Sequence, residues 1–196
     1  MQISNLQHTS FNTIIECFFD AFENYFVTIP RDKDYFQKRW EAAKVNFSLS
    51  YGMFDGDQLV GFIIHAVDKR NGKRIAFNTG TGVLPAYRGK KILKSIYDFA
   101  LDDLRKHQIE ASSLEVIKEN EIAVNAYKAV GFEISRGYKC FKGELELIKN
   151  VHLKLVDKTS KTTDELPRQE FYSWDNQWET IKGDKNYDFY EIQGEN

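Results

Sequence analysis

Apolar side chains recur at three- and four-residue intervals near the start of the chain. Five residues share this spacing: Phe11, Ile15, Phe18, Phe22 and Phe26. Such spacing places side chains on one face of a helix. Pro30 lacks the amide hydrogen that a helix needs, so the pattern ends there. The sequence therefore predicts an amphipathic helix over residues 11–26 and a shorter helix over residues 32–45.

The next part of the chain is rich in apolar and β-branched residues, which favour strands. Three runs stand out: FSLSYGMF (47–54), QLVGFIIHAV (58–67) and RIAFNTGTGVL (74–84). Asp55-Gly56 and Asn71-Gly72 separate them. These dipeptides are typical of tight hairpin turns. We therefore expect three consecutive antiparallel strands.

Helical and strand patterns then alternate. An apolar stripe from Ile92 to Leu104 predicts a helix, SSLEVI (112–117) a buried strand, and residues 120–130 a helix that Gly131 ends. Residues 132–148 indicate one or two more strands. A strand, a crossover helix and another strand favour a parallel pair. The expected fold class is mixed α/β (α+β), with a central, mostly antiparallel sheet flanked by helices over residues 1–149.

A C-terminal extension, residues 150–196, is polar but retains many aromatic residues. Phe171, Trp174 and Trp178 have the spacing of one face of a short helix, and residues 187–192 alternate as in a strand. A lone short helix and strand are marginal in water. We therefore expect the extension to pack on the first domain or on a second copy of the chain, forming a homodimer.

Composition limits the partners. Of the 196 residues, 42% are hydrophobic and 29% charged, as in a globular protein, and the net charge of -2 gives no broad basic surface for nucleic acid or a membrane. The apolar run 59–67 is too short to span a bilayer. Residues 1–16 lack the pattern of a signal peptide, which predicts a cytoplasmic protein. Cys17 and Cys140 lie far apart without metal-ligand spacing, so we expect free thiols and no metal.

A basic turn precedes the helix that begins near Ile92. The strand ending in Val83 and Leu84 leads into the residues Arg88, Gly89, Lys90 and Lys91. Neither the P-loop pattern nor the Rossmann glycine pattern is present. Exposed amides at a helix start, framed by positive charge, bind phosphate groups. The alternative is a solvated helix start with incidental charge.

Two motifs in sequence order resemble the GNAT superfamily of N-acetyltransferases. VLPAYRGKKI matches the strand and pyrophosphate-binding turn, and Asn120, Ala123, Tyr127, Gly131 and Phe132 match a second element. The resemblance covers about residues 45–145. It implies a GNAT-like fold, acetyl-CoA as co-substrate and direct transfer of its acetyl group to a primary amine of a small molecule or peptide.

The resemblance also implies residue roles. Backbone groups of Val83 and Leu84 would bind the pantetheine arm, and residues 88–93, with Ile92 and Leu93 in the first helical turn, would bind the diphosphate. Tyr127 would protonate the leaving thiolate, or else be a packing tyrosine. Asn120 would bind pantetheine or cap its own helix.

One departure from the family pattern affects the diphosphate turn. Lys91 and Leu93 stand where the family has glycine and a small residue. A lysine in right-handed helical geometry would still offer its amide, whereas Leu93 would crowd the nucleotide. Binding of CoA without turnover, and a scaffold that keeps only the fold, are therefore alternatives to an enzyme.

The acceptor site and the general base are less patterned. Glu16, Asp20 and Glu23 fall on one helical face, which with Tyr25 would attract a cationic amine or would be a solvated face. His65 lies in an apolar strand and is interpreted as a core histidine rather than a base. Glu115 and solvent water remain alternatives for the base.

Overall fold

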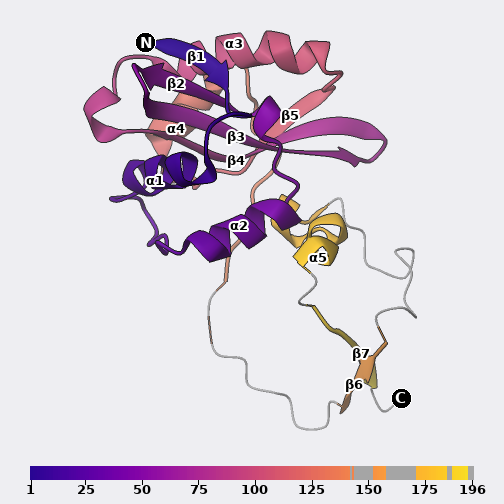
Figure 1. The fold of residues 1–196 in the computed structure, drawn as a ribbon. Coiled ribbons are helices and arrows are strands. Elements are labelled where there is room, and N and C mark those ends of the chain that lie inside the picture. The colour runs from indigo at the N-terminus through magenta and orange to yellow at the C-terminus, as the bar shows by residue number, and fades with distance from the viewer. Residues whose placement is uncertain (142, 144–151, 158–170, 185–186, 194–196) are drawn as a thin grey trace. The chain divides into compact units, whose positions relative to one another are not determined.

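The computed structural model describes residues 1–141, 143, 152–157, 171–184 and 187–193. The chain divides into two compact units, residues 1–133 and 134–196. The elements of the first unit, drawn in Figure 1, are β1 (Gln2–Asn5), α1 (Phe11–Ala21), α2 (Lys33–Ala42), η1 (Phe47–Leu49), β2 (Tyr51–Asp55), β3 (Gln58–Arg70), β4 (Lys73–Val83), η2 (Pro85–Tyr87), α3 (Ile92–Lys106), β5 (Ala111–Leu114) and α4 (Glu121–Lys128). The expected domain boundary at residue 149 lies outside the described residues.

A five-stranded sheet forms the centre of the first unit, with strands in the order β1-β2-β3-β4-β5. Its first four strands pair antiparallel, and β4 pairs with β5 in parallel across the helix α3. The two expected hairpins join β2 to β3 and β3 to β4. This mixed, mostly antiparallel sheet with flanking helices confirms the predicted fold class.

Apolar side chains of β3 alternate between two cores. Phe62 and Ile64 pack with residues of α1 and α2, whereas Val60 and Ile63 pack with residues of α3. Half-buried Tyr127, Val130 and Phe132, on and after α4, join the second core. The helices α1 and α2 therefore cover one face of the sheet, and α3 covers the other (Figure 1).

Gly82 sets the distance between α1 and the sheet. A Cβ atom built at this position would lie 2.6 Å from Phe62 Cζ and 2.7 Å from Ala21 Cβ. Both distances are far below ordinary van der Waals contact. Glycine is therefore required where the end of α1 crosses β4.

The first helix is shorter than the expected range 11–26. It ends at Ala21, and the Phe22 amide donates hydrogen bonds to the Phe18 and Phe19 carbonyls. The apolar spacing continues beyond the helix because the ring of Tyr25 packs edge-on against Phe22 and Phe26, at centroid distances of 4.9 Å and 5.5 Å. Aromatic residues that pack together in a turn can therefore have the same sequence spacing as residues on one face of a helix.

The structure departs from the sequence predictions at two further places. The strand β1, four residues long and paired with β2, was not predicted from the sequence. The prediction of strands over residues 132–148 is wrong for the described residues 132–141 and 143, none of which is in a strand. Both cysteines are free, as expected, with Cys17 buried and Cys140 exposed.

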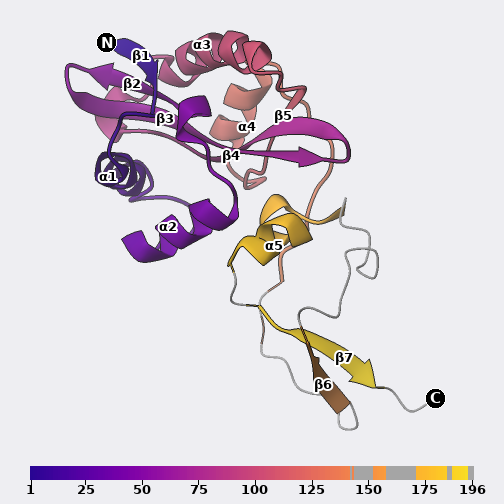
Figure 2. The ribbon, with the colours of Figure 1, turned by 45° about the vertical axis from the view of Figure 1, so that its right-hand side comes forward.

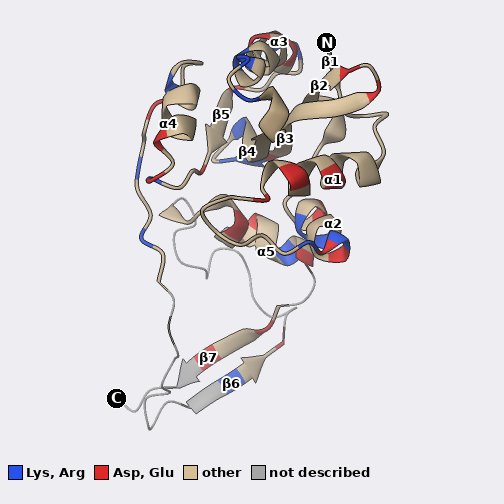
Figure 3. Ribbon diagram, turned by 90° about the vertical axis from the view of Figure 1, so that its left-hand side faces the viewer, with Lys and Arg blue, Asp and Glu red and all other residues tan. Residues whose placement is uncertain are grey.

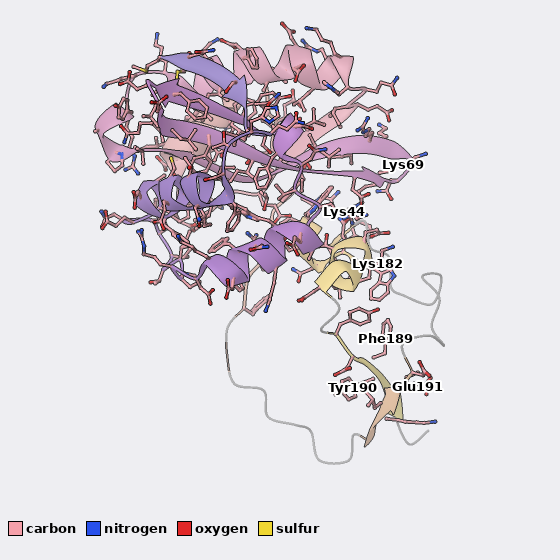
Figure 4. The ribbon with its side chains drawn as sticks, in the orientation of Figure 1. Lys44, Lys69, Lys182, Phe189, Tyr190 and Glu191 are labelled. Carbon is pink, nitrogen blue, oxygen red and sulfur yellow. The ribbon has the colours of Figure 1, made fainter. Side chains whose placement is uncertain are left out.

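The second unit contains β6 (His152–Val156), η6 (Trp174–Asn176), α5 (Trp178–Asp184) and β7 (Phe189–Gln193). β7 overlaps the strand expected over residues 187–192 and pairs antiparallel with β6 (Figure 2). Tyr190 and Glu191 lie on opposite sides of β7 (Figure 4), as strand alternation requires.

The expected helix of the extension is displaced along the chain. It begins at Trp178, so Phe171, Trp174 and Trp178 do not share one helical face. The ring of Trp178 instead packs against Tyr187 and Phe189, at 5.0 Å and 5.2 Å. None of the helices in the described ranges combines the length and the apolar composition that a membrane-spanning segment needs.

His65 is fully buried in β3, beside the second core. Its Nδ1 lies 2.7 Å from the Leu49 carbonyl oxygen, and its Nε2 has no hydrogen-bond partner. Because a carbonyl only accepts, Nδ1 carries a hydrogen, and the buried Nε2 without a partner leaves the ring neutral. Burial lowers the pKa of His65 from its ordinary 6.5 to about 4. His65 is thus a core residue.

We expect His65 to make stability depend on pH. The folded pKa lies below the unfolded one, so the neutral ring contributes fully above pH 6.5 and its contribution falls as the pH drops toward 4. The two pKa values correspond to about 3 kcal/mol in the free energy of unfolding. His65→Asn keeps an N–H near Leu49 but does not titrate. Urea unfolding at pH 7 and pH 4 should show a smaller loss in the variant, and equal losses would contradict this assignment.

Candidate functional site

The pairing between β4 and β5 ends in the middle of β4. The last parallel pair is Asn78 with Leu114, whereas β4 continues beside β3 as far as Val83. Opposite β3 the register shifts so that Thr79 is an extra residue, a β-bulge. Beyond Asn78, the edge of β4 away from β3 has no strand partner among the described residues. An extended, amide-rich molecule can pair with such an edge.

Polar side chains meet where the two strands separate. Asn78 Nδ2 lies 2.6 Å from Thr81 Oγ1 and 2.7 Å from the hydroxyl of Tyr97 on α3. The Asn78 side-chain oxygen accepts a hydrogen bond of 3.0 Å from the Gly80 amide. Asn78 and Tyr97 are both buried. These residues were not predicted from the sequence, although an asparagine and two threonines inside an apolar strand were a signal.

The expected general acid, Tyr127, joins this group from α4. Its ring packs edge-on against Tyr97, with the centroids 6.3 Å apart. Burial raises the pKa of Tyr127, hydrogen bonding with the Thr81 and Asn78 side chains lowers it, and the nearby Tyr25 phenol raises it. The structure therefore brings Tyr127 to the end of the β4–β5 pairing, together with Tyr25 from the segment after α1.

The basic turn after β4 has an unusual backbone. Gly89 and Lys91 have positive φ angles of 76° and 58°, and α3 begins directly after them. The expectation of right-handed geometry at Lys91 is wrong, because this residue is left-handed. No side chain caps α3 and its first turn has no acidic residue. Its start thus offers amides and positive potential to an anion.

Arg88 contacts carbonyl oxygens on both sides of the turn. Its Nε donates to the Val83 carbonyl at 3.2 Å and its Nη2 to the Ala21 carbonyl at 2.9 Å. The Lys90 ammonium lies 4.6 Å from the centre of the Tyr87 ring, and the Tyr87 hydroxyl donates to Asp55 at 2.9 Å. The turn is therefore tied both to the end of α1 and to the β2–β3 hairpin.

The other residues expected to bind CoA are placed as follows. Ile92 is buried, and Leu93 is half-buried and packs against the second core. Val83 and Leu84 are half-buried at the end of β4. Asn120 caps α4, where its side-chain oxygen accepts a hydrogen bond of 3.1 Å from the Ala123 amide. Of the two roles considered for Asn120, the helix cap is the one that the structure contains.

The acidic residues of α1 are largely neutralised by basic neighbours. Arg31 lies 3.1 Å from Glu16 and 3.2 Å from Asp20, and Lys33 lies 2.7 Å from Glu16. Figure 3 shows acidic residues on α1 and mixed charges on α2. Glu23 is exposed beyond the helix end. Across the described ranges, no group of three or more His, Cys, Asp or Glu side chains could hold a metal.

Comparison with known proteins identifies a family. Residues 11–132 match the model of the acetyltransferase (GNAT) family. A search of curated proteins found no match.

Solved structures share the fold. A probable acetyltransferase has 16% identity and a TM-score of 0.58, with 74% of this chain and 99% of that chain covered. An aminoglycoside acetyltransferase from an uncultured soil metagenomic sample, in complex with sisomicin, has 16% identity and a TM-score of 0.57, with 74% and 96% covered. A ribosomal-protein-alanine N-acetyltransferase from Brucella melitensis biovar Abortus 2308 has 16% identity and a TM-score of 0.57, with 73% and 100% covered. At these identities the likeness concerns the fold.

We expect Lys91→Gly to stabilise the protein. A side chain in left-handed geometry costs about 1 kcal/mol, which glycine avoids. The free energy of unfolding, measured by urea denaturation, should therefore rise by up to about 1 kcal/mol. Lys91→Ala is the matched control, because it removes the charge but keeps the Cβ atom, and it should give no gain. Equal effects of the two variants would show that charge, not backbone geometry, decides stability at this position.

Proposed function

The chain belongs to the acetyltransferase (GNAT) family, and we propose that it transfers the acetyl group of acetyl-CoA to a primary amine by direct attack. The observation that carries the proposal is the position of Tyr127. Its ring packs edge-on against Tyr97, whose hydroxyl shares the Asn78 side-chain amide with Thr81 at the point where β4 loses its parallel partner. An acid is thus available beside a strand edge that can hold the thioester.

The start of α3 is proposed to bind the diphosphate of CoA. The amides of Ile92, Leu93 and the next residue begin a helix without a side-chain cap. Lys90 and Lys91 add two exposed positive charges. Amides and cations together form strong contacts with phosphate. The packing of Leu93 against the second core supports this site, because a leucine held there does not extend freely over the helix start.

The pantetheine arm is proposed to pair with the edge of β4 beyond Asn78. This edge leads through Val83 and Leu84 to the basic turn, so one extended molecule follows it from the acetyl group to the diphosphate. Backbone groups of Val83 and Leu84 would pair with the pantetheine amides. An amide near Val83 would stabilise the oxyanion that forms when the amine attacks the thioester carbonyl.

The proposed chemistry is a single addition and collapse. The neutral amine attacks the carbonyl carbon, the carbon–sulfur bond breaks, and the thiolate takes the Tyr127 proton. The nitrogen loses a proton to solvent. His65 is not the base, because it is buried in the core with its Nδ1 bonded to Leu49. Solvent returns a proton to Tyr127 before the next turnover.

The acceptor is proposed to bind beside the segment after α1. Glu23 and Tyr25 lie there, and Tyr25 is near Tyr127. Asp20, which we also expected at this site, is paired with Arg31, so Glu23 is left to attract an ammonium group. Enzymes of this fold named for aminoglycosides and for a ribosomal protein support small molecules and peptides alike as the amine.

A second candidate function is binding of CoA without turnover. The observation that favours it is the left-handed lysine at the start of α3, where a side chain stands close to the proposed diphosphate site. A thermal shift with acetyl-CoA is expected for both candidates. Release of CoA with a panel of primary amines is expected only for the enzyme.

We expect Arg88→Ala to weaken CoA binding at least tenfold. The variant loses a charge beside the proposed diphosphate site and two hydrogen bonds that hold the end of β4, and a charged hydrogen bond contributes about 1.5–3 kcal/mol. Calorimetric titration with CoA measures the change. Arg105→Ala is the control, since Arg105 lies in the last turn of α3 in an exposed pair with Asp102. Unchanged affinity in folded Arg88→Ala would remove this site.

We expect Tyr127→Phe to lower kcat by about 10²–10⁴-fold, because the thiolate would leave without its proton donor. The Michaelis constant for acetyl-CoA should change little, since the hydroxyl acts in the transition state. Steady-state release of CoA with an active amine checks both values. Tyr35→Phe, an exposed tyrosine of α2, is the control. Wild-type turnover in the Tyr127 variant would rule out the assignment.

A further inference from the structure

The helix α1 ends without a basic residue of its own. Its last residue is Ala21, and its last turn contains no lysine or arginine. The last carbonyl groups of a helix lack partners inside the helix and carry partial negative charge, which a cation stabilises. Arg88, 67 residues further along the chain, supplies this cation, because its Nη2 donates to the Ala21 carbonyl at 2.9 Å. Arg88 thus serves the end of a helix to which it does not belong.

The same guanidinium also holds the end of β4. Its Nε donates to the Val83 carbonyl at 3.2 Å. A guanidinium is planar and its N–H groups point in fixed directions, so two bonds from one group fix the Ala21 carbonyl relative to the Val83 carbonyl. Gly82 allows this close approach, since a Cβ atom there would lie 2.7 Å from Ala21 Cβ. Packing and Arg88 together therefore hold the end of α1 against the end of β4.

The segment after α1, residues 22–31, begins at this bond. The Phe22 amide donates back to carbonyls of α1, and the Tyr25 amide donates to the Phe22 carbonyl at 3.1 Å. The rings of Phe22 and Tyr25 pack together with their centroids 4.9 Å apart. These contacts tie the segment to the end of α1, so the position of the Ala21 carbonyl determines where the segment lies.

Arg88 keeps donors for an anion. Its Nη1 takes part in neither carbonyl bond, and a guanidinium carries more N–H groups than two bonds use. The residue is exposed and lies in the turn before α3, beside the amides proposed to bind the diphosphate. An anion there can bond the guanidinium while both carbonyl bonds remain. Such an anion would restrain the side chain further rather than release it.

We propose that Arg88 is a positioning residue that couples the two proposed binding sites. CoA at the start of α3 restrains the guanidinium, and the guanidinium holds the segment after α1 in place for the amine. This inference rests on the proposed function. The coupling is positive, because the diphosphate adds a contact to the two carbonyl bonds and replaces neither. CoA should therefore raise the affinity for the amine, and by linkage the amine should raise the affinity for CoA.

Amide hydrogen exchange, followed by NMR, tests this role without turnover. The probes are the hydrogen-bonded amides of Phe22 and Tyr25. Arg88→Lys keeps the positive charge but loses the planar fork that reaches two carbonyls at once. Both amides should exchange about two- to tenfold faster in this variant, as expected for the loss of one hydrogen bond, while amides in the middle of α3 keep their wild-type rates. Saturating CoA should slow both amides in the wild type and less so in Arg88→Lys.

Lys90→Ala is the matched control. Lys90 lies in the same turn, and its ammonium lies 4.6 Å from the centre of the Tyr87 ring. Its replacement should weaken CoA binding in a calorimetric titration but leave the exchange of the Phe22 and Tyr25 amides in the free protein unchanged. If Lys90→Ala and Arg88→Lys accelerate exchange equally, the effect comes from the turn as a whole and the proposal is overturned.

Steady-state kinetics give the second test. Arg88→Lys should raise the Michaelis constant for an active amine about two- to tenfold and change kcat less than about twofold, because the bond acts on binding and not on the chemical step. Unchanged amide exchange in Arg88→Lys, or faster exchange on addition of CoA to the wild type, would overturn the coupling even if the protein transfers acetyl groups. Conversely, the expected exchange pattern in a protein that acetylates no amine would support the coupling and overturn the proposed function.

Discussion

The hydrogen bond from the Gly80 amide to the Asn78 side chain fixes the geometry on which the site depends. A bulge leaves backbone groups without ladder partners, and here the asparagine oxygen takes one of them at 3.0 Å. The same residue forms the last parallel pair with β5. One side chain thus stands where the sheet opens, satisfies the bulged backbone and orients two hydroxyl groups.

Arg88 connects the two sides of the opened sheet. Its guanidinium bonds the last carbonyl of α1 and the carbonyl at the end of β4, while Gly82 lets the helix approach the strand closely. The segment after α1 carries the proposed acceptor residues, and the turn after β4 carries the proposed diphosphate site. Because Arg88 bonds both segments, the proposed acceptor site and the proposed CoA site depend on the same side chain. The sequence suggested a phosphate ligand or a solvated helix start at this position, since charge is visible in a sequence and a carbonyl partner 67 residues away is not.

The sequence predicted much of the fold because periodicity and turn residues are local signals. The three-strand meander, α3 and α4 follow from alternation, the Asx-Gly turns and apolar stripes. The strand β1 was missed because four residues carry too little pattern, and α1 was overextended because Phe22 and Tyr25 pack in a turn. Among the candidate site residues, Tyr127 was found through a motif. Its partners Asn78, Thr81 and Tyr97 come from two other elements, so no local spacing joins them. The pairing of Asp20 with Arg31 is likewise a tertiary contact that a helical stripe does not reveal.

The acid of the proposed site is Tyr127, whose pKa depends on its neighbours. The buried His65 is neutral and lies in the core instead. Burial alone would make Tyr127 a poor proton donor, because a phenolate is costly in an apolar surrounding. The neighbouring Thr81 and Asn78 side chains lower the pKa of Tyr127 and so oppose the effect of burial. The amine, by contrast, must lose its proton to solvent before it attacks, since His65 sits in the core with a pKa of about 4 and its Nδ1 already bonded. The acceptor's own basicity therefore governs the acidic side of the reaction.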